Sequence, residues 1–246
     1  MSGAGGYDDA RRSGGARIAG GHGRGGQEIG GGWEATHATG NANEVPDQPT
    51  SFDFDAESEA ALAAIVKRYP PGKQASAVIP ALYLVQRQMG RQTGSAWVPR
   101  VAMDLVAERL GMPPIRVYEV ATFYLMFNTK RIGKVHLQVC GTTPCWLRGS
   151  DDVFRACKDA GHLKGYGDTS ADGMFTLTEV ECLGGCVNAP VLQVDDDYYE
   201  DLDYDRTVAL LDALRRGERP QPGSAIGRQT SAPVGGALTL IDVPGE

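Results

Sequence analysis

Four of the five cysteines lie in two short loops whose spacing suits a metal centre. Cys140 and Cys145 are separated by four residues, and Cys182 and Cys186 by three. Each loop directly follows a segment that is predicted to be a strand. If these two strands are neighbours in one sheet, all four sulfurs converge at its rim. The spacing therefore predicts a single site made from both loops.

Small and turn-forming residues fill both loops. Thr142, Thr143 and Pro144 lie in the first loop, and Gly184 and Gly185 lie in the second. These residues let the backbone fold tightly and expose N–H groups toward anionic sulfur. A [2Fe–2S] cluster requires four thiolates whose charge is met by such hydrogen bonds. The loops therefore favour a [2Fe–2S] cluster as the bound group.

The spacing of the cysteines by itself also permits other roles for the four thiols. Structural zinc takes paired cysteines two to four residues apart, and the present spacing is at the loose end of that range. Two disulfides require an oxidising compartment, but the first residues lack the pattern of a signal peptide. A redox-active dithiol favours C-x-x-C, which the sequence lacks. The spacing differs from that of plant-type ferredoxins, and no Cys-x-His pair suggests a Rieske site.

Cys157 is the fifth cysteine, and it stands apart from both loops. It shares a predicted helical face with Val153, Ala156 and Ala160. A free cysteine in such a setting behaves as a small apolar residue. We therefore expect Cys157 to be buried and not to be a ligand.

The overall composition narrows the classes of function. The chain has 246 residues, of which 41% are hydrophobic and 22% charged, as in ordinary globular proteins. The net charge of −7 argues against a nucleic-acid partner, because binding to phosphates requires a surplus of Lys and Arg. No apolar run reaches even half of the ~20 residues that a membrane helix requires, so we expect no insertion into a membrane.

The first 50 residues differ from the rest of the chain. Residues 1–50 hold 14 of the 33 glycines and contain no Leu, Phe or Cys, which predicts a disordered tail. Residues 21–26 match G-x-G-x-x-G, but this dinucleotide-binding pattern has meaning only between a strand and a helix. We find no such unit, and no P-loop, in the remainder of the sequence. The chain is therefore not expected to bind NADH or FMN by itself.

Helical periodicity dominates residues 51–130. Four apolar stripes predict four short helices that pack as a small bundle. We expect the second helix to close near Gly90 and Gly111 to end the third. The four stripes lie within residues 62–69, 78–89, 99–110 and 117–124.

An alternating pattern begins near Lys134 and predicts an α/β domain over residues 131–217. Ser150 is expected to cap its first helix. The order β-α-β-β-β-α is compatible with a thioredoxin-like layout. Residues 218–246 are rich in Pro, Gly and Ser and are predicted to form an extended tail. The predicted strands span residues 134–139, 174–180, 191–194 and 197–199, and the last helix spans residues 204–216.

An acidic run separates the last predicted strands from the last helix. Residues 195–205 hold seven acids and no base. Such a run is typical of a solvated hairpin and helix start. It could instead face a basic patch on a partner.

Several motifs together resemble the small [2Fe–2S] subunit of the NADH-oxidising module of respiratory complex I. They lie in residues 140–150, 173–175, 179–190 and 198–202. The resemblance extends over residues 52–242. The glycine-rich first 50 residues depart from the family pattern.

This resemblance implies a thioredoxin-like [2Fe–2S] domain behind a helical bundle, with Cys140, Cys145, Cys182 and Cys186 as the cluster ligands. It also implies an electron-transfer subunit of NADH:quinone oxidoreductase that is not catalytic alone. The implied partners are a flavoprotein subunit, which binds FMN and NADH, and the larger iron–sulfur subunit. The tail over residues 218–246 would dock on the partner.

The implied location is the cytoplasm of a bacterium, peripheral to the inner membrane, in preference to a mitochondrial matrix. Two alternatives accompany this interpretation. One is the equivalent diaphorase subunit of an NAD-linked hydrogenase or formate dehydrogenase. The other is a zinc-stapled adaptor protein, which would be colourless where a [2Fe–2S] protein is red-brown.

Overall fold

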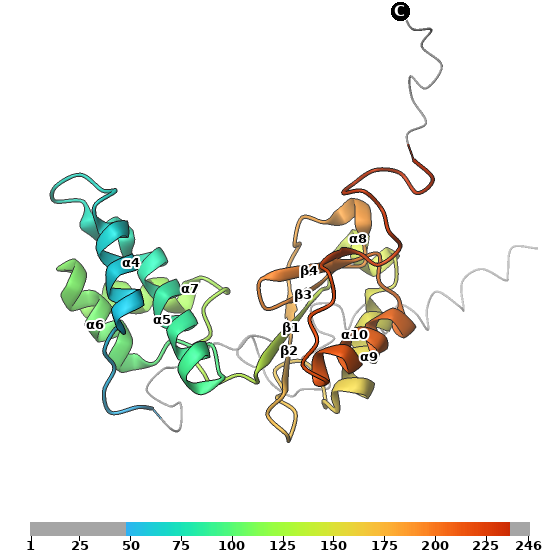
Figure 1. The fold of residues 1–246 in the computed structure, drawn as a ribbon, viewed down its shortest axis with the longest axis horizontal. Helices are drawn as coiled ribbons and strands as arrows, with labels where there is room; N and C mark the ends of the chain where they lie inside the picture. Colours follow the sequence, from blue (N-terminus) through green and yellow to red (C-terminus); the bar gives the residue numbers. More distant parts are fainter. Residues whose placement is uncertain (1–47, 237–246) are drawn as a thin grey trace, which may run out of the picture. The chain divides into compact units, whose positions relative to one another are not determined.

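The computed structural model of the chain describes residues 48–236, which fall into two units (Figure 1). The first unit contains residues 48–135 together with residues 165–176. The second unit contains residues 136–164 together with residues 177–236. The chain therefore passes between the two units three times.

Most of the predicted N-terminal tail and the end of the predicted C-terminal tail lie beyond the described residues. Most of the tail predicted over residues 1–50, and residues 237–246 of the C-terminal tail, lie outside them. Within the described part of the chain, no helix combines the length and the apolar character needed to cross a membrane.

Helices form most of the first unit, at the four places that the sequence predicts. The central helix α5 contacts each of the other three α-helices. A short 3₁₀ helix, η1, leads directly into α5. The elements are α4 (Ala56–Val66), η1 (Gln74–Ala77), α5 (Val78–Thr93), α6 (Arg100–Leu110) and α7 (Pro114–Phe123).

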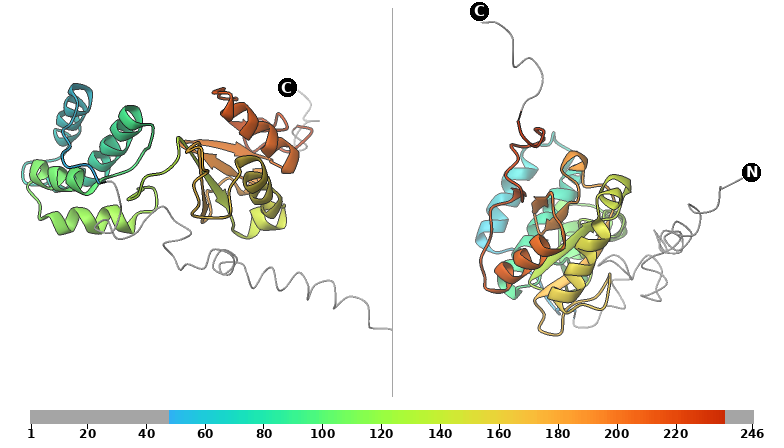
Figure 2. Two further views of the ribbon diagram at one scale, coloured as in Figure 1. Left: turned by 90° about the horizontal axis from the view of Figure 1, so that it is seen from below. Right: turned by 90° about the vertical axis from the view of Figure 1, so that its right-hand side faces the viewer.

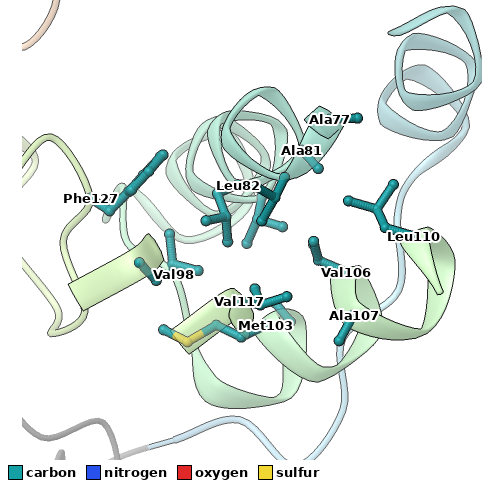
Figure 3. Close-up of a cluster of buried hydrophobic side chains, with 14 of the residues drawn as sticks. Ala77, Ala81, Leu82, Val98, Met103, Val106, Ala107, Leu110, Val117 and Phe127 are labelled. Carbon is teal, nitrogen blue, oxygen red and sulfur yellow. The ribbon is translucent and has the colours of Figure 1, made fainter. Parts of the chain in front are cut away.

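The core of the first unit is apolar and closed to solvent. Leu82 of α5, Met103 and Val106 of α6 and Val117 of α7 are fully buried. Their side chains gather between the three helices (Figure 3). Burying a side chain of this size contributes about 1.5–3 kcal/mol, so this core supplies much of the stability of the helical unit.

Helix ends follow the glycines only in part. Gly111 ends α6 in the left-handed region with φ 63°, as predicted. The second helix closes about one turn later than predicted, because α5 continues past Gly90 to Thr93 and ends at Gly94 with φ 75°. Gly90 has instead a packing role, since a Cβ there would lie 3.3 Å from the Cβ of Ala96.

A mixed five-stranded sheet organises the second unit, in the order β2-β1-β3-β4-β5. β1 pairs with β3 and β3 with β4 in antiparallel fashion, while β4 pairs with β5 in parallel. Val135 N donates to Met174 O, and Gly141 N donates to Val180 O. This constant offset makes β1 and β2 parallel, so both strands end at the same edge. The strands are β1 (Val135–Cys140), β2 (Phe175–Val180), β3 (Leu192–Val194), β4 (Asp197–Glu200) and β5 (Gly223–Ser224).

Two longer helices of this unit, α9 (Ser150–Gly161) and α10 (Tyr204–Arg215), pack side by side (Figure 2). The predicted cap at Ser150 is wrong. Gly149 occupies the cap position with φ 103°, and Ser150 is the first helical residue, with a buried hydroxyl. Only glycine adopts that backbone conformation readily, which displaces the cap by one residue. The predicted α/β class of this unit is confirmed.

Candidate metal centre

The first cysteine loop, residues 140–145, is held by regular structure at both ends, and we call it the buried loop. Cys140 is the last residue of β1, and Cys145 lies within the short helix α8 (Thr143–Leu147). Trp146 N donates to Thr142 O at 2.9 Å, which closes the first turn of this helix. Both cysteines are 1% exposed. The loop therefore fixes two thiols away from solvent.

The second cysteine loop, residues 182–186, is more open, and we call it the open loop. It begins just beyond the end of β2 and turns at Gly184, where φ is 87°. Cys182 is exposed, and Cys186 is half-buried at the start of the 3₁₀ turn η2 (Cys186–Asn188). The two sulfurs of this loop lie 3.3 Å apart.

The two loops meet at the edge where β1 and β2 end. The Thr142 hydroxyl lies 3.3 Å from Cys140 Sγ, and it also hydrogen-bonds Cys182. The backbone N–H of Leu183 in the open loop donates to the Cys140 sulfur. The structure thus brings all four predicted site residues together, as two pairs of thiols linked by Thr142.

Hydrogen bonds between the paired thiols shift their proton affinities in opposite directions. The neighbouring Cys145 thiol lowers the pKa of Cys140 to about 5, helped by Thr142 and backbone N–H groups. The bond to Cys140 and burial raise the pKa of Cys145. In the open loop, the Gly184 N–H lowers the pKa of Cys182. The surroundings therefore stabilise negative charge on one sulfur of each pair.

The donor set suits a [2Fe–2S] cluster. All five cysteines carry free thiols. Within residues 48–236, no three or more His, Cys, Asp or Glu side chains gather around one point as a single metal ion would require. The thiols form instead two pairs, each with a backbone N–H directed at a sulfur. Two pairs of thiolates with N–H donors match a centre of two irons.

Cys157 lies in α9 and is completely buried, as predicted. Burial raises the pKa of its thiol, so it stays protonated and inert. It forms no part of either pair. The structure therefore separates the fifth cysteine from the four in the loops.

Sequence reasoning missed Asn188, the last residue of η2. Asn188 is 3% exposed, and its Nδ2 donates to Glu200 Oε2 at 2.6 Å and to Thr230 O at 2.8 Å. The sequence does not indicate its role because its hydrogen-bond partners lie 12 and 42 positions away. Its place two residues after Cys186 is the signal that could have identified it.

The acidic run is not solvated throughout, contrary to the expectation. Asp203 caps α10 by accepting from Arg206 N at 2.8 Å, which fits the predicted helix start. Asp201, however, is 7% exposed and forms an ion pair with Arg228. This carboxylate is turned inward because a distant arginine compensates its charge.

Known proteins resemble this chain over most of the described residues. The family model "Thioredoxin-like [2Fe-2S] ferredoxin" matches residues 62–215. A subunit of the NADH-quinone oxidoreductase of Rickettsia conorii is 52% identical over 166 residues, which cover 68% of this chain and 96% of the relative. The corresponding subunit from Rickettsia bellii is 51% identical with the same coverage.

A solved structure of an NAD⁺-reducing [NiFe]-hydrogenase in the air-oxidised state aligns with a TM-score of 0.47 and 17% identity. The alignment covers 57% of this chain and 23% of the hydrogenase chain. The match of the family model spans both cysteine loops and the sheet edge where they meet. The chain belongs to the thioredoxin-like [2Fe–2S] ferredoxin family.

Proposed function

We propose that the chain is the electron-transfer subunit of an NADH-quinone oxidoreductase, with its [2Fe–2S] cluster bound by Cys140, Cys145, Cys182 and Cys186. The observation that carries the proposal is the meeting of two thiol pairs where β1 and β2 end side by side. Relatives about half identical to this chain are named as a subunit of that oxidoreductase. The family itself is one of [2Fe–2S] proteins.

The arrangement of the thiols favours this proposal over a zinc-stapled adaptor. A structural zinc ion takes four ligands around one centre. Here the thiols form two pairs, which supports one pair for each of two irons. The N–H groups of Leu183 and Gly184 donate to sulfur, as a cluster with net negative charge requires.

The two loops divide the work of holding the cluster. When bound, the cluster accepts and releases one electron at a time. The buried loop excludes water from one side, because both of its cysteines are 1% exposed. The open loop leaves Cys182 at the surface, where a partner can approach. The fold therefore shields one side of the site and presents the other.

Apolar side chains border the presented side. Leu147, at the end of α8, is 69% exposed, and Val187, in η2, is 64% exposed. These two elements contact each other. Each residue follows a loop cysteine by one or two positions. Exposed apolar residues beside a redox site favour docking of another protein.

We assign this docking surface to the flavoprotein subunit that binds FMN and NADH. The larger iron–sulfur subunit is the further partner, and the complex would hold the chain at the membrane periphery. The end of the C-terminal tail predicted over residues 218–246 contributes to the same association. Its residues 237–241 form an apolar run, Ala-Leu-Thr-Leu-Ile, suited to a partner surface.

An anaerobic titration with NADH tests the function. The full chain is purified without oxygen, its iron and acid-labile sulfide are measured, and visible bleaching is followed during the titration. The chain alone is expected to show no bleaching with NADH, because residues 48–236 contain no strand, glycine-rich loop and helix unit that would bind a dinucleotide and no P-loop. Bleaching is expected once the flavoprotein is added.

Dithionite serves as the control, because it should reduce the cluster with or without the partner and give an EPR signal. Bleaching of the lone chain by NADH would show a nucleotide site in this chain and contradict the role as an accessory electron carrier. A colourless protein with stoichiometric zinc would support the adaptor instead.

A further inference from the structure

The turn that carries Cys186 has little support of its own. η2 spans only three residues, and the open loop before it contains no strand or helix. Asn188 closes this turn, with its N–H donating to Gly185 O at 3.0 Å. Asp201 N donates to Asn188 O at 2.7 Å. The turn is therefore fastened to the end of β4 through the backbone of Asn188.

The side chain of Asn188 adds a second connection, to the chain beyond α10. Its Nδ2 donates to Glu200 Oε2 and to Thr230 O, and both of these atoms can only accept. The orientation of the amide is thus determined by its partners. The turn depends on a segment that follows it by about 40 residues.

That segment, residues 223–232, we call the strap. Its start pairs with β4 as β5, and Ala225 N donates to Glu200 O at 2.9 Å. Tyr199 OH donates to Pro220 O just before the strap, at 2.8 Å. The strap therefore runs along the sheet edge next to the residues that hold Asn188.

An ion pair fastens the middle of the strap. Arg228 Nη2 donates to Asp201 Oδ1 at 2.8 Å, and its Nε donates to Asp201 Oδ2 at 3.1 Å. Ser224 Oγ donates to the same carboxylate at 2.7 Å. The side chains of the pair are only 10% and 4% exposed. A bidentate pair with so little exposure to solvent is among the stronger polar contacts of a protein.

The strap also forms one wall of a cavity beside the open loop. The cavity has a volume of about 640 Å³. Gly184, Gly185 and Asn188 also line it. The strap therefore borders the open loop as well as holding its turn.

We propose that Arg228 and Asn188 are positioning residues for Cys186. Arg228 locks the strap to Asp201, and the locked strap holds Asn188 and the η2 turn in place. This inference rests on the proposed function, because it takes Cys186 as a cluster ligand. In this inference Asn188 acts on Cys186 through the η2 turn, and Arg228 acts on Asn188 through the strap.

Substitutions at the ion pair test this role in the full, cluster-loaded chain. Arg228→Met removes the lock but leaves the Asp201 charge uncompensated. The double variant Arg228→Met/Asp201→Asn removes both charges, and asparagine tolerates the φ of 54° at position 201. Both variants are expected to lose iron to a chelator about tenfold faster, which is the lower end of the loss of metal affinity that follows removal of a residue that orients a ligand.

Arg219→Met is the matched control. Arg219 pairs with Asp195 at 2.8 Å, but this pair is exposed and lies outside the strap. It should release iron at the wild-type rate. Wild-type rates in both Arg228 variants would overturn the proposal. Recovery of the wild-type rate in the double variant alone would also overturn it, because uncompensated charge would then explain the single variant.

Hydrogen exchange of the unaltered chain provides a test that does not depend on folding of a variant. Peptides covering residues 184–190 and 223–232 are expected to be protected to a similar degree. Free exchange of the strap beside a protected turn would overturn the proposal.

Cys186→Ser separates this inference from the proposed function. Loss or alteration of the EPR signal supports the ligand assignment. An unchanged signal would overturn that assignment and the inference with it, whereas failure of the Arg228 variants alone leaves the assignment intact.

Discussion

The buried loop and the open loop each supply two thiols to the same sheet edge, but they are held in different ways. In the buried loop, Cys140 ends a central strand and Cys145 lies within a helix. In the open loop, Cys182 and Cys186 lie in a glycine turn and a single 3₁₀ turn. The buried loop is rigid through its own elements, whereas the open loop depends on residues brought from elsewhere in the chain.

This difference has a physical reason in the function we propose. A cluster buried on every side would be stable but remote from any partner, and electron transfer requires close approach. One rigid, dry side and one exposed side meet both needs. The open side then requires its support from behind, which is where Asn188 and the strap lie.

The largest expected effect comes from replacing one cysteine of each loop with serine and comparing the two variants. Cys140→Ser should abolish the cluster, because this position is fixed at the strand end and a serine oxygen there cannot move. Cys182→Ser should retain some cluster with an altered EPR spectrum, because this exposed position can adjust or admit solvent as a ligand. Iron, acid-labile sulfide and EPR after dithionite measure both outcomes. Equal loss in the two variants would contradict the comparison.

The second test of the comparison uses acid. β1, which leads into the buried loop, contains a buried histidine, whereas β2, which precedes the open loop, contains none. His136 of β1 lies with Nε2 2.9 Å from Thr178 Oγ1, and burial lowers its pKa to about 4. In the unfolded chain the pKa is about 6.5, so the unfolded state gains a proton first as the pH falls. Stability should therefore decrease by about 2 kcal/mol between pH 7 and pH 5.

Urea unfolding of the full chain at both pH values measures this decrease. His136→Gln keeps a polar side chain that can hydrogen-bond Thr178 but has no proton to gain in this range. The change in the free energy of unfolding between the two pH values is subtracted for the two proteins. This removes the contribution of the carboxylates, which titrate in both. An identical pH dependence in the variant would show that His136 is not the source.

The smallest expected effect is that of replacing Cys157, which tests whether a buried cysteine must also be a ligand. Cys157 is as deeply buried as the thiols of the buried loop, yet it lies in α9 and has no thiol partner. Cys157→Ser should lower the free energy of unfolding by about 1–2 kcal/mol, because it buries a hydroxyl in place of sulfur. Its EPR spectrum should match that of the unaltered chain. Loss of the cluster in this variant would contradict our assignment of Cys157.

Local patterns made much of the fold predictable. The helices of the first unit and the alternating strands follow from the spacing of apolar residues, which acts over a few positions. The cysteine loops could be placed because they directly follow such strands. By contrast, α8 has only five residues and β5 only two, which is too short for any periodicity to show.

The support behind the open loop could not be predicted, because it depends on long-range contacts. Asp201 and Arg228 are 27 positions apart, and nothing in either neighbourhood marks them as a pair. The acidic run even indicates a solvated Asp201. Prediction also fails at short range for Ser150. This residue is a favourable helix cap, but Gly149, with a positive φ, takes the cap position instead.

The way in which the chain passes between its two units also limits how its gene can recombine. Residues 165–176 belong with the helices, and the chain enters that segment only after β1 and α9. A Cβ at Gly133 would lie 2.8 Å from the carbonyl carbon of Phe175. A single crossover between positions 135 and 175 would therefore combine a position 133 and a position 175 from different parents. When the parent that supplies position 133 lacks glycine there, its Cβ would force a shift of the strand supplied by the other parent. A contact between residues 42 positions apart therefore disfavours such exchanges.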